Sequence, residues 1–434
     1  MESINLFWFR RDLRLHDNCG LYHALNSGKP VLAIFIFDKN ILSDLEDKKD
    51  ARLTFIHQQL EKINEKLHTK GSALITLYDT PEKAFEKLTS EYQVDTVYTN
   101  NDYEPYARNR DNEIKLLLKK RGIKFNSYKD QVIFEKEELV KSDGTPYLVY
   151  TPYSKKWLSM VNSKQLLPYK SGLSFHNWLQ IPPREINTIA SLRFKRSRLS
   201  FPEQELNNEM LLSYEAERDF PEKDSTSKLG IHLRFGTISI RDLCAKVETQ
   251  SLTFYKELIW REFFMMILYH FPQVVEKNFY SKFDAIQWRN NEEDFEKWCL
   301  GKTGFPMVDA GMRELNETGF MHNRVRMVAA SFLCKHLLID WKWGEAYFAH
   351  KLLDYDLASN NGNWQWCAGT GVDASPYFRV FNPTIQLEKF DRNHVYINRW
   401  IKDFNELSYP KPMLDHKMAR ERAISVYKAA VGGL

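Results

Sequence analysis

The chain has 434 residues, of which 43% are hydrophobic and 27% are charged, and its formal net charge is +4. This length predicts two domains, and the small positive charge permits a polyanionic partner without requiring one. The five cysteines are scattered and include no C-x-x-C pair, which argues against a disulfide framework and a structural zinc site. Because no apolar stretch reaches membrane-spanning length, we expect a cytoplasmic protein that does not enter a membrane.

The first 130 residues alternate between short apolar runs and amphipathic stretches. The apolar runs predict strands over 6–9, 31–37, 73–78, 96–99 and 124–128. The amphipathic stretches predict helices over 18–26, 51–68, 81–91 and 106–121. Thr80 is expected to cap the helix that starts at Pro81, and Gly122 to follow a helix end. Strands that alternate with helices imply parallel crossovers, so we expect an α/β domain with a doubly wound parallel sheet over 1–130.

The pattern changes near residue 130. Residues 131–205 are irregular and rich in proline, which predicts an interdomain linker that contains short helices. From residue 208 onward helical periodicity dominates, so residues 206–434 are predicted to form an all-α domain. The clearest helical stretches are 253–269, 304–317, 323–336 and 343–353.

Several common catalytic motifs are missing from the chain. The run 301–303 resembles the end of a phosphate-binding loop, but Glu296 stands where that loop requires glycine. No G-x-G-x-x-G follows the first strand, and neither G-x-S-x-G nor H-E-x-x-H occurs. The histidines show no ligand spacing, so no metal site is expected.

Residues 354–366 are the most informative segment, because two acids, adjacent amides and two indoles lie close together. This composition suits a pocket that hydrogen-bonds a polar heterocycle and stacks aromatic rings or relays electrons. The alternative is a buried turn with satisfied amides. Asp354 and Asp356 could accept hydrogen bonds from a ribose, a ring imide or an arginine, with Arg324 or Arg326 as partner; alternatively, they cap the following turn.

Two helical groups upstream could contribute to the same site. Glu257, Trp260 and Arg261 share one helix face, either as pocket residues or as an ordinary ion pair beside a core indole. Asn323 and Met327 also share a face, so that the amide could read the edge of a base or a flavin. The alternative for this second group is a solvated basic helix start with Met327 in the core.

Taken together, the motifs resemble the photolyase/cryptochrome family along the full length of the chain. They are FWFRRDLR (7–14), ELIWREF (257–263), GFPMVDA (304–310), FMHNRVRM (320–327), NNGNWQW (360–366) and YFRVFNP (377–383). Within the family the chain is most similar to class I cyclobutane pyrimidine dimer (CPD) DNA photolyases. Enzymes for the 6-4 lesion carry histidines in place of residues like Asn323 and Met327, and DASH-type cryptochromes usually carry tyrosine at Trp366.

The resemblance implies one FAD in the helical domain, reduced in the active state. Asn360 would face the flavin N5, with Asp354, Tyr355 and Asp356 near the ribose and isoalloxazine. Gly230 departs from the serine usual in the family, so one phosphate-facing hydroxyl is lost. The residues implied for the phosphate side are Tyr214, Thr226, Ser227, Lys228, Leu229 and Gly230, of which 226–230 form a hydroxyl-rich run that could otherwise be a plain helix cap.

The resemblance also implies the activity and the partner. Photoexcited reduced FAD would give one electron to a pyrimidine dimer flipped out of UV-damaged DNA, the ring would split, and the electron would return. Glu257 would hydrogen-bond the lesion, Trp260 and Trp366 would sandwich it, and Asn323 and Met327 would contact its edges. Arg218, Arg261, Arg324 and Gln386 would bind the DNA. Trp364, Trp341 and Trp288 match the family's electron path from the surface, and we expect a monomer.

An antenna chromophore on the sheet domain and two other functions remain open. Glu104, Tyr106 and Arg108 look more like deazaflavin-binding relatives than folate-binding ones, yet deazaflavin, folate, a second flavin and an empty pocket are all possible. A blue-light-sensing cryptochrome-type flavoprotein that signals through a partner is the first alternative function. A flavin-dependent redox enzyme for small molecules is the second. The set Glu257, Trp260 and Trp366 favours DNA repair over both.

Overall fold

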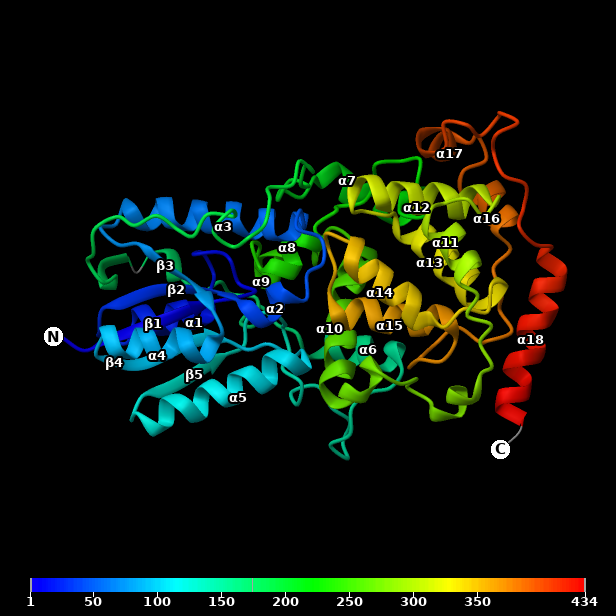
Figure 1. The fold of residues 1–434 in the computed structure, drawn as a ribbon. Coiled ribbons are helices and arrows are strands. Elements are labelled where there is room, and N and C mark those ends of the chain that lie inside the picture. Colours follow the sequence, from blue (N-terminus) through cyan, green and yellow to red (C-terminus); the bar gives the residue numbers. More distant parts are fainter. Residues whose placement is uncertain (1, 174, 433–434) are drawn as a thin grey trace. The chain divides into compact units, whose positions relative to one another are not determined.

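The computed structural model describes residues 2–173 and 175–432, and the chain divides into two compact units (Figure 1). The first comprises Met1–Glu138, Ser159–Glu205 and Lys228–Thr249, and the second comprises Leu139–Leu158, Leu206–Ser227 and Gln250–Leu434. The segment predicted as a linker is therefore shared between the units. Residues 228–249, expected in the helical domain, belong by their contacts to the first unit.

The first unit is built on a five-stranded sheet in which every strand pair is parallel. The strand order is β3-β2-β1-β4-β5, which confirms the predicted doubly wound α/β architecture. The central strand β1 and its neighbour β2 are buried along their whole length, because helices cover both faces of the sheet. The strands are β1 (Ile4–Phe9), β2 (Val31–Asp38), β3 (Leu74–Asp79), β4 (Val94–Asn100) and β5 (Lys124–Tyr128).

The helices of this unit lie on opposite faces of the sheet. Apolar side chains of α4 (Pro81–Glu91) and α5 (Pro105–Lys120) share one core cluster with Leu6 and Trp8 of β1. Figure 1 shows α3 (Ala51–His68) across the opposite face, and α1 (Cys19–Leu25) and α2 (Lys39–Ser43) complete the unit. Thr80 is the N-cap of α4 with an extended backbone, as predicted, although its side chain makes no capping hydrogen bond.

Buried ion pairs explain why residues 228–249 belong to the sheet unit. Arg241 on α9 (Ile240–Val247) pairs with Asp17 at 2.9 Å and with Asp130 at 2.8 Å, and both carboxylates are fully buried. Arg14 pairs with the second oxygen of Asp130 at 2.7 Å. Breaking such a buried network costs about 3–5 kcal/mol, so α9 and the short α8 (Gly230–Phe235) stay attached to the sheet unit.

The second unit is all-α, as predicted. The expected helices 253–269, 304–317 and 343–353 are present within about two residues at each end. The stretch 323–336 is an α-helix only to Ser331 and continues as one π-helical turn over Phe332–His336. The helices are α6 (Tyr150–Met160, whose last two residues group with the first unit), α7 (Asn208–Glu217), α10 (Leu252–His270), α11 (Glu292–Cys299), α12 (Pro306–Thr318), α13 (Asn323–Ser331), α14 (Trp341–Lys351), α15 (Leu357–Ala368), α16 (Pro383–Phe390), α17 (Val395–Trp400) and α18 (His416–Gly432).

Two glycines let the central helices of this unit approach closely. A Cβ on Gly344 of α14 would lie 2.1 Å from the Trp364 ring, and one on Gly362 of α15 would lie 2.2 Å from the Phe264 ring. These contacts bring α15 against α14 on one side and against α10 on the other. In the part of the chain that the structure describes, no helix combines the length and the apolarity needed to cross a bilayer.

Candidate functional site

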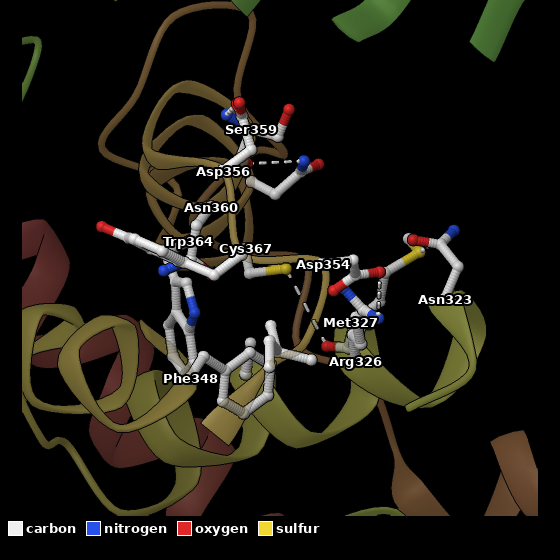
Figure 2. A pocket seen from close by; sticks show the side chains of 14 residues that line it. Asn323, Arg326, Met327, Phe348, Asp354, Asp356, Ser359, Asn360, Trp364 and Cys367 are labelled. Atoms are coloured by element: carbon white, nitrogen blue, oxygen red, sulfur yellow. Dashed lines mark hydrogen bonds and ion pairs between the residues drawn. The ribbon is translucent and has the colours of Figure 1, made fainter. Parts of the chain in front are cut away.

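A pocket opens in the second unit between α13, α14 and α15 (Figure 2). It encloses about 560 Å³ of space out to its mouth, a size typical of small-molecule and cofactor pockets. Acidic, amide and aromatic side chains share its wall, so it can hydrogen-bond the edge of a polar heterocycle and contact its flat faces. The lining residues are Asn323, Arg326, Met327, Ala330, Phe348, Leu352, Asp354, Tyr355, Asp356, Ser359, Asn360, Asn363, Trp364 and Cys367.

The sequence of α15 explains why an amide and an indole meet in this pocket. Asp356 is the N-cap of the helix and accepts a hydrogen bond from the Ser359 main-chain nitrogen at 3.1 Å. Asn360 and Trp364 follow four residues apart, so they share one face of the helix. Both side chains are almost fully buried, and Figure 2 shows them projecting from α15 into the pocket. Asp356 is thus a helix cap and a pocket residue at once.

The orientation of Asn360 is set by Glu345 on α14. The amide nitrogen of Asn360 donates to Glu345 Oε1 at 2.8 Å and to the Glu345 main-chain oxygen at 3.1 Å. Burial raises the pKa of the Glu345 carboxyl, and the hydrogen bond from Asn360 offsets part of that rise. Since both bonds use the amide nitrogen, neither of them engages the Asn360 Oδ1 atom, which can accept a hydrogen bond.

The two arginines of α13 have different partners. Arg326 makes a two-pronged ion pair with Asp354, at 2.9 and 3.2 Å, and both residues line the pocket. Arg324 pairs instead with Asp219 at 2.7 Å and lies 4.5 Å over the ring of Phe390. Of the two partners that the sequence allowed for Asp354, the structure therefore selects Arg326.

A second hollow adjoins the first and shares four lining residues with it: Asn323, Met327, Ser359 and Asn363. It encloses about 810 Å³ of space out to its mouth. The other lining residues are Arg218, Glu257, Trp260, Arg261, Phe264 and Trp366. Seven of the nine residues predicted to bind DNA therefore meet around one hollow, while Arg324 and Gln386 lie outside its lining.

An ion pair holds the acid of this second hollow in place. Glu257 Oε1 lies 2.6 Å from the Arg218 guanidinium, whereas the sequence had suggested Arg261 as its partner on the same helix face. Burial lowers the pKa of Arg218, but the Glu257 carboxylate outweighs that effect and the pKa is raised overall. Both side chains are partly exposed, at 21% and 36%, so the pair contributes about 1 kcal/mol or less to stability and mainly orients the carboxylate.

Comparison with known proteins places this arrangement in a family. Residues 254–408 match the family model for the FAD binding domain of DNA photolyase, and residues 5–170 match the model for DNA photolyase. The deoxyribodipyrimidine photo-lyase of Agrobacterium fabrum is 35% identical over 98% of this chain and 97% of its own length. That of Escherichia coli is 34% identical over 99% of this chain and all of its own. The chain belongs to the photolyase/cryptochrome family.

Solved structures agree with this assignment. A class III photolyase from Agrobacterium tumefaciens has a TM-score of 0.87 and 34% identity, and the match covers 99% of this chain and 98% of that one. An archaeal photolyase from Sulfolobus tokodaii, solved with two FAD molecules, has a TM-score of 0.84 and 33% identity over 98% of this chain and all of its own. The chain is thus an enzyme of the photolyase type, and its class within the photolyases stays a prediction.

The residues that the photolyase resemblance assigned to the phosphate side divide between the two units. Tyr214 on α7 packs edge-on against Phe254 at 5.0 Å and lies under the Arg218 guanidinium. Thr226 and Ser227 are the last two residues of the segment Leu206–Ser227, which belongs to the second unit. Residues 228–230 belong to the first unit. Lys228 has a left-handed backbone, with a φ of 52°, which turns the chain just before α8.

The three tryptophans of the predicted electron path differ in exposure. Trp364 and Trp341 are buried, and Trp288 is only partly buried. The Trp341 indole donates to Asn278 Oδ1 at 2.9 Å. Trp364 has its close ring contacts with Phe348, at 4.9 Å between centroids, and with Trp298, at 6.1 Å.

Glu345 and Trp298 are site residues that the sequence did not reveal. Each lies in a helix without any recognised motif, and each reaches α15 only through packing between helices. Among the described residues, no group of three or more histidine, cysteine, aspartate or glutamate side chains could hold a metal ion.

Proposed function

We propose that the chain repairs cyclobutane pyrimidine dimers in DNA by light-driven electron transfer from reduced FAD. The observation that carries this proposal is the pair of adjoining hollows, because one suits a flavin and the other suits two fused pyrimidines. Asn323 and Met327 line both hollows, so ligands in the two would lie next to each other.

The residues of the first pocket fit a flavin. Asn360 is only 8% exposed and is oriented by Glu345, so it offers a fixed hydrogen-bond partner to the ring edge. Trp364 and Phe348 offer aromatic contact. We propose that Asp354, Tyr355, Asp356 and Asn360 hold the flavin and ribose, and that Tyr214, Thr226, Ser227, Lys228, Leu229 and Gly230 hold the phosphates. When bound in its reduced form, FAD supplies the electron that splits the dimer, and absorbed light supplies the energy.

The second hollow suits a lesion taken out of the DNA helix. A damaged base pair is easier to extrude than an intact one because its stacking is already weakened. Trp260 and Trp366 would contact the apolar faces of the pyrimidines, and Glu257, oriented by Arg218, would accept a hydrogen bond from a ring N–H. Arg218 and Arg261 place positive charge at the hollow, which attracts the DNA backbone.

Residues outside the hollow complete the proposal. Arg324 and Gln386 would contact the DNA backbone beside it. Trp364, Trp341 and Trp288 would pass electrons inward from the partly exposed Trp288 to the two buried indoles.

We also propose an antenna chromophore on the sheet unit. Tyr106 is the second residue of α5, the helix that follows β4. It is 42% exposed and donates a hydrogen bond to Asp38 Oδ2 at 2.6 Å. The Glu104 carboxylate, by contrast, forms ion pairs with Arg11, at 2.9 Å, and with Arg234. Ligands of α/β sheets bind beyond the carboxyl ends of strands, so we place a second chromophore near Tyr106 and Arg108, as deazaflavin, folate or a second flavin. Spectra of the extracted chromophores would distinguish these.

A repair assay tests the main proposal. The purified protein, with FAD bound and chemically reduced, is mixed with an oligonucleotide that contains one thymine dimer and is exposed to blue light or kept dark. We expect restoration of the intact thymines in the light alone, and none with a matched 6-4 lesion. A protein that binds FAD but leaves dimers unrepaired under light would overturn the proposal and favour the blue-light-sensing alternative.

A further inference from the structure

The indole of Trp260 in the second hollow is stacked on the ring of Tyr150. The two ring centroids are 3.6 Å apart and the planes are inclined by only 8°. Trp260 itself is partly exposed at the hollow, whereas Tyr150 is only 8% exposed. Tyr150 thus lies behind the indole and is not among the residues that line the hollow. It also lies outside the sequence motifs that predicted the site.

Tyr150 is held at both of its ends. Its hydroxyl donates to the Lys256 main-chain oxygen at 2.8 Å, one helical turn before Trp260 on α10. Its main-chain nitrogen, the first of α6, donates to Asp373 Oδ2 at 3.0 Å. The ring also packs edge-on against Phe263 at 5.9 Å. These contacts fix both the position of the ring along α10 and its plane.

A fixed ring behind Trp260 has a consequence for ligand binding. A partly exposed aromatic side chain without such a support would sample several rotamers, and ordering it on binding would cost affinity. Phe263 and Phe264 also contact the indole, at 5.6 and 5.4 Å between ring centroids, but Tyr150 is stacked much closer, at 3.6 Å, and so contributes most to fixing the indole before a ligand arrives. Undamaged DNA, whose bases stay inside the helix, would gain nothing from this order.

We propose that Tyr150 is a positioning residue of the lesion site: it holds the Trp260 indole in the plane that a flipped-out pyrimidine dimer contacts, and so increases the preference for damaged over undamaged DNA. The inference rests on the proposed function, because it assigns Trp260 to the lesion. Tyr150 acts through Trp260 and does not touch the substrate.

Dark binding measurements test this role without requiring repair. The holoprotein is titrated with an oligonucleotide carrying one thymine dimer and with the same oligonucleotide undamaged, and the ratio of the two dissociation constants is the readout. Tyr150→Leu should lower that ratio about three- to tenfold, the range expected from loss of one stacked aromatic pair, with little change for undamaged DNA. Tyr150→Phe keeps the ring and should retain most of the ratio.

Two further variants separate positioning from general destabilisation. Tyr153→Leu removes another buried ring from the same helix, but this ring packs against Phe263 at 5.2 Å and is not the one stacked on Trp260, so the ratio should persist. In a Trp260→Leu background, Tyr150→Leu should lower the ratio no further.

The outcomes distinguish the two levels of inference. A wild-type protein without preference for the dimer would reject the proposed function. A wild-type preference that Tyr150→Leu leaves unchanged, or that Tyr150→Leu lowers equally in the Trp260→Leu background, would overturn the role of Tyr150 alone.

Discussion

Replacing Gly344 by alanine should displace Trp364 from the wall of the cofactor pocket. A Cβ at Gly344 would lie 2.1 Å from Trp364 Cη2 and 2.5 Å from Leu333 Cδ2, whereas real Cβ contacts are not found below 3.0 Å. Trp364 is 2% exposed and Leu333 is fully buried, so neither side chain can move aside into solvent. The overlap must be relieved by a shift of the indole or of α14 against α15.

The magnitude follows from two opposing effects. Alanine is favoured over glycine inside a helix by about 1 kcal/mol. Overpacking a buried site costs about 1–3 kcal/mol, and the rigid indole places Gly344→Ala at the upper end of that range. The variant should therefore lose about 2 kcal/mol of unfolding free energy in the second unit. Because Trp364 lines the pocket beside Asn360, FAD affinity should fall as well.

Urea unfolding followed by tryptophan fluorescence, and FAD titration followed by flavin fluorescence, would measure both effects. Gly432→Ala is the matched control, because no atom lies within 4 Å of the added Cβ, and it should change neither quantity appreciably. If Gly344→Ala were as stable as the wild type and bound FAD equally well, the close contact between Gly344 and the Trp364 ring would be refuted.

Three other changes test separate parts of the site. Trp364→Phe should block light-driven reduction of oxidised FAD yet spare repair by the chemically reduced protein, whereas Trp343→Phe should affect neither; photoreduction at the wild-type rate would remove Trp364 from the path. Glu257→Gln should lower dimer repair per absorbed photon about tenfold, as expected for a lost charged hydrogen bond, with a smaller loss of DNA affinity; equal losses would contradict its role at the lesion. Burial and the Arg326 charge lower the pKa of His322 to about 4. Since the unfolded chain takes up this proton near pH 6.5, the unfolding free energy should fall by up to about 3 kcal/mol as pH drops from 6.5 to 4. His322→Asn keeps the helix cap and should reduce this loss of unfolding free energy at low pH. If the variant lost as much unfolding free energy between pH 6.5 and 4 as the wild type, His322 would not be the cause.

Local patterns in the sequence predicted most of the elements. The continuous apolar runs at β1 and β2 were recognisable because both faces of a doubly wound sheet are buried. The predicted helix over 323–336 lost its regular form at Phe332, where the chain continues as a π-helical turn that no periodicity distinguishes from an α-helix. Thr80 is the N-cap that its place before Pro81 predicted, although its side chain makes no capping hydrogen bond.

What the sequence by itself determined were the relations among residues close together in the chain. Helical spacing put Asn360 with Trp364 and Asn323 with Met327 on shared faces, and the ordered motifs identified the family. Only the tertiary structure decided that Arg326 rather than Arg324 pairs with Asp354, and that Glu345 and Tyr150 support the site. The physical reason is that spacing along a helix is set by backbone geometry, whereas contacts between distant segments depend on how whole helices pack.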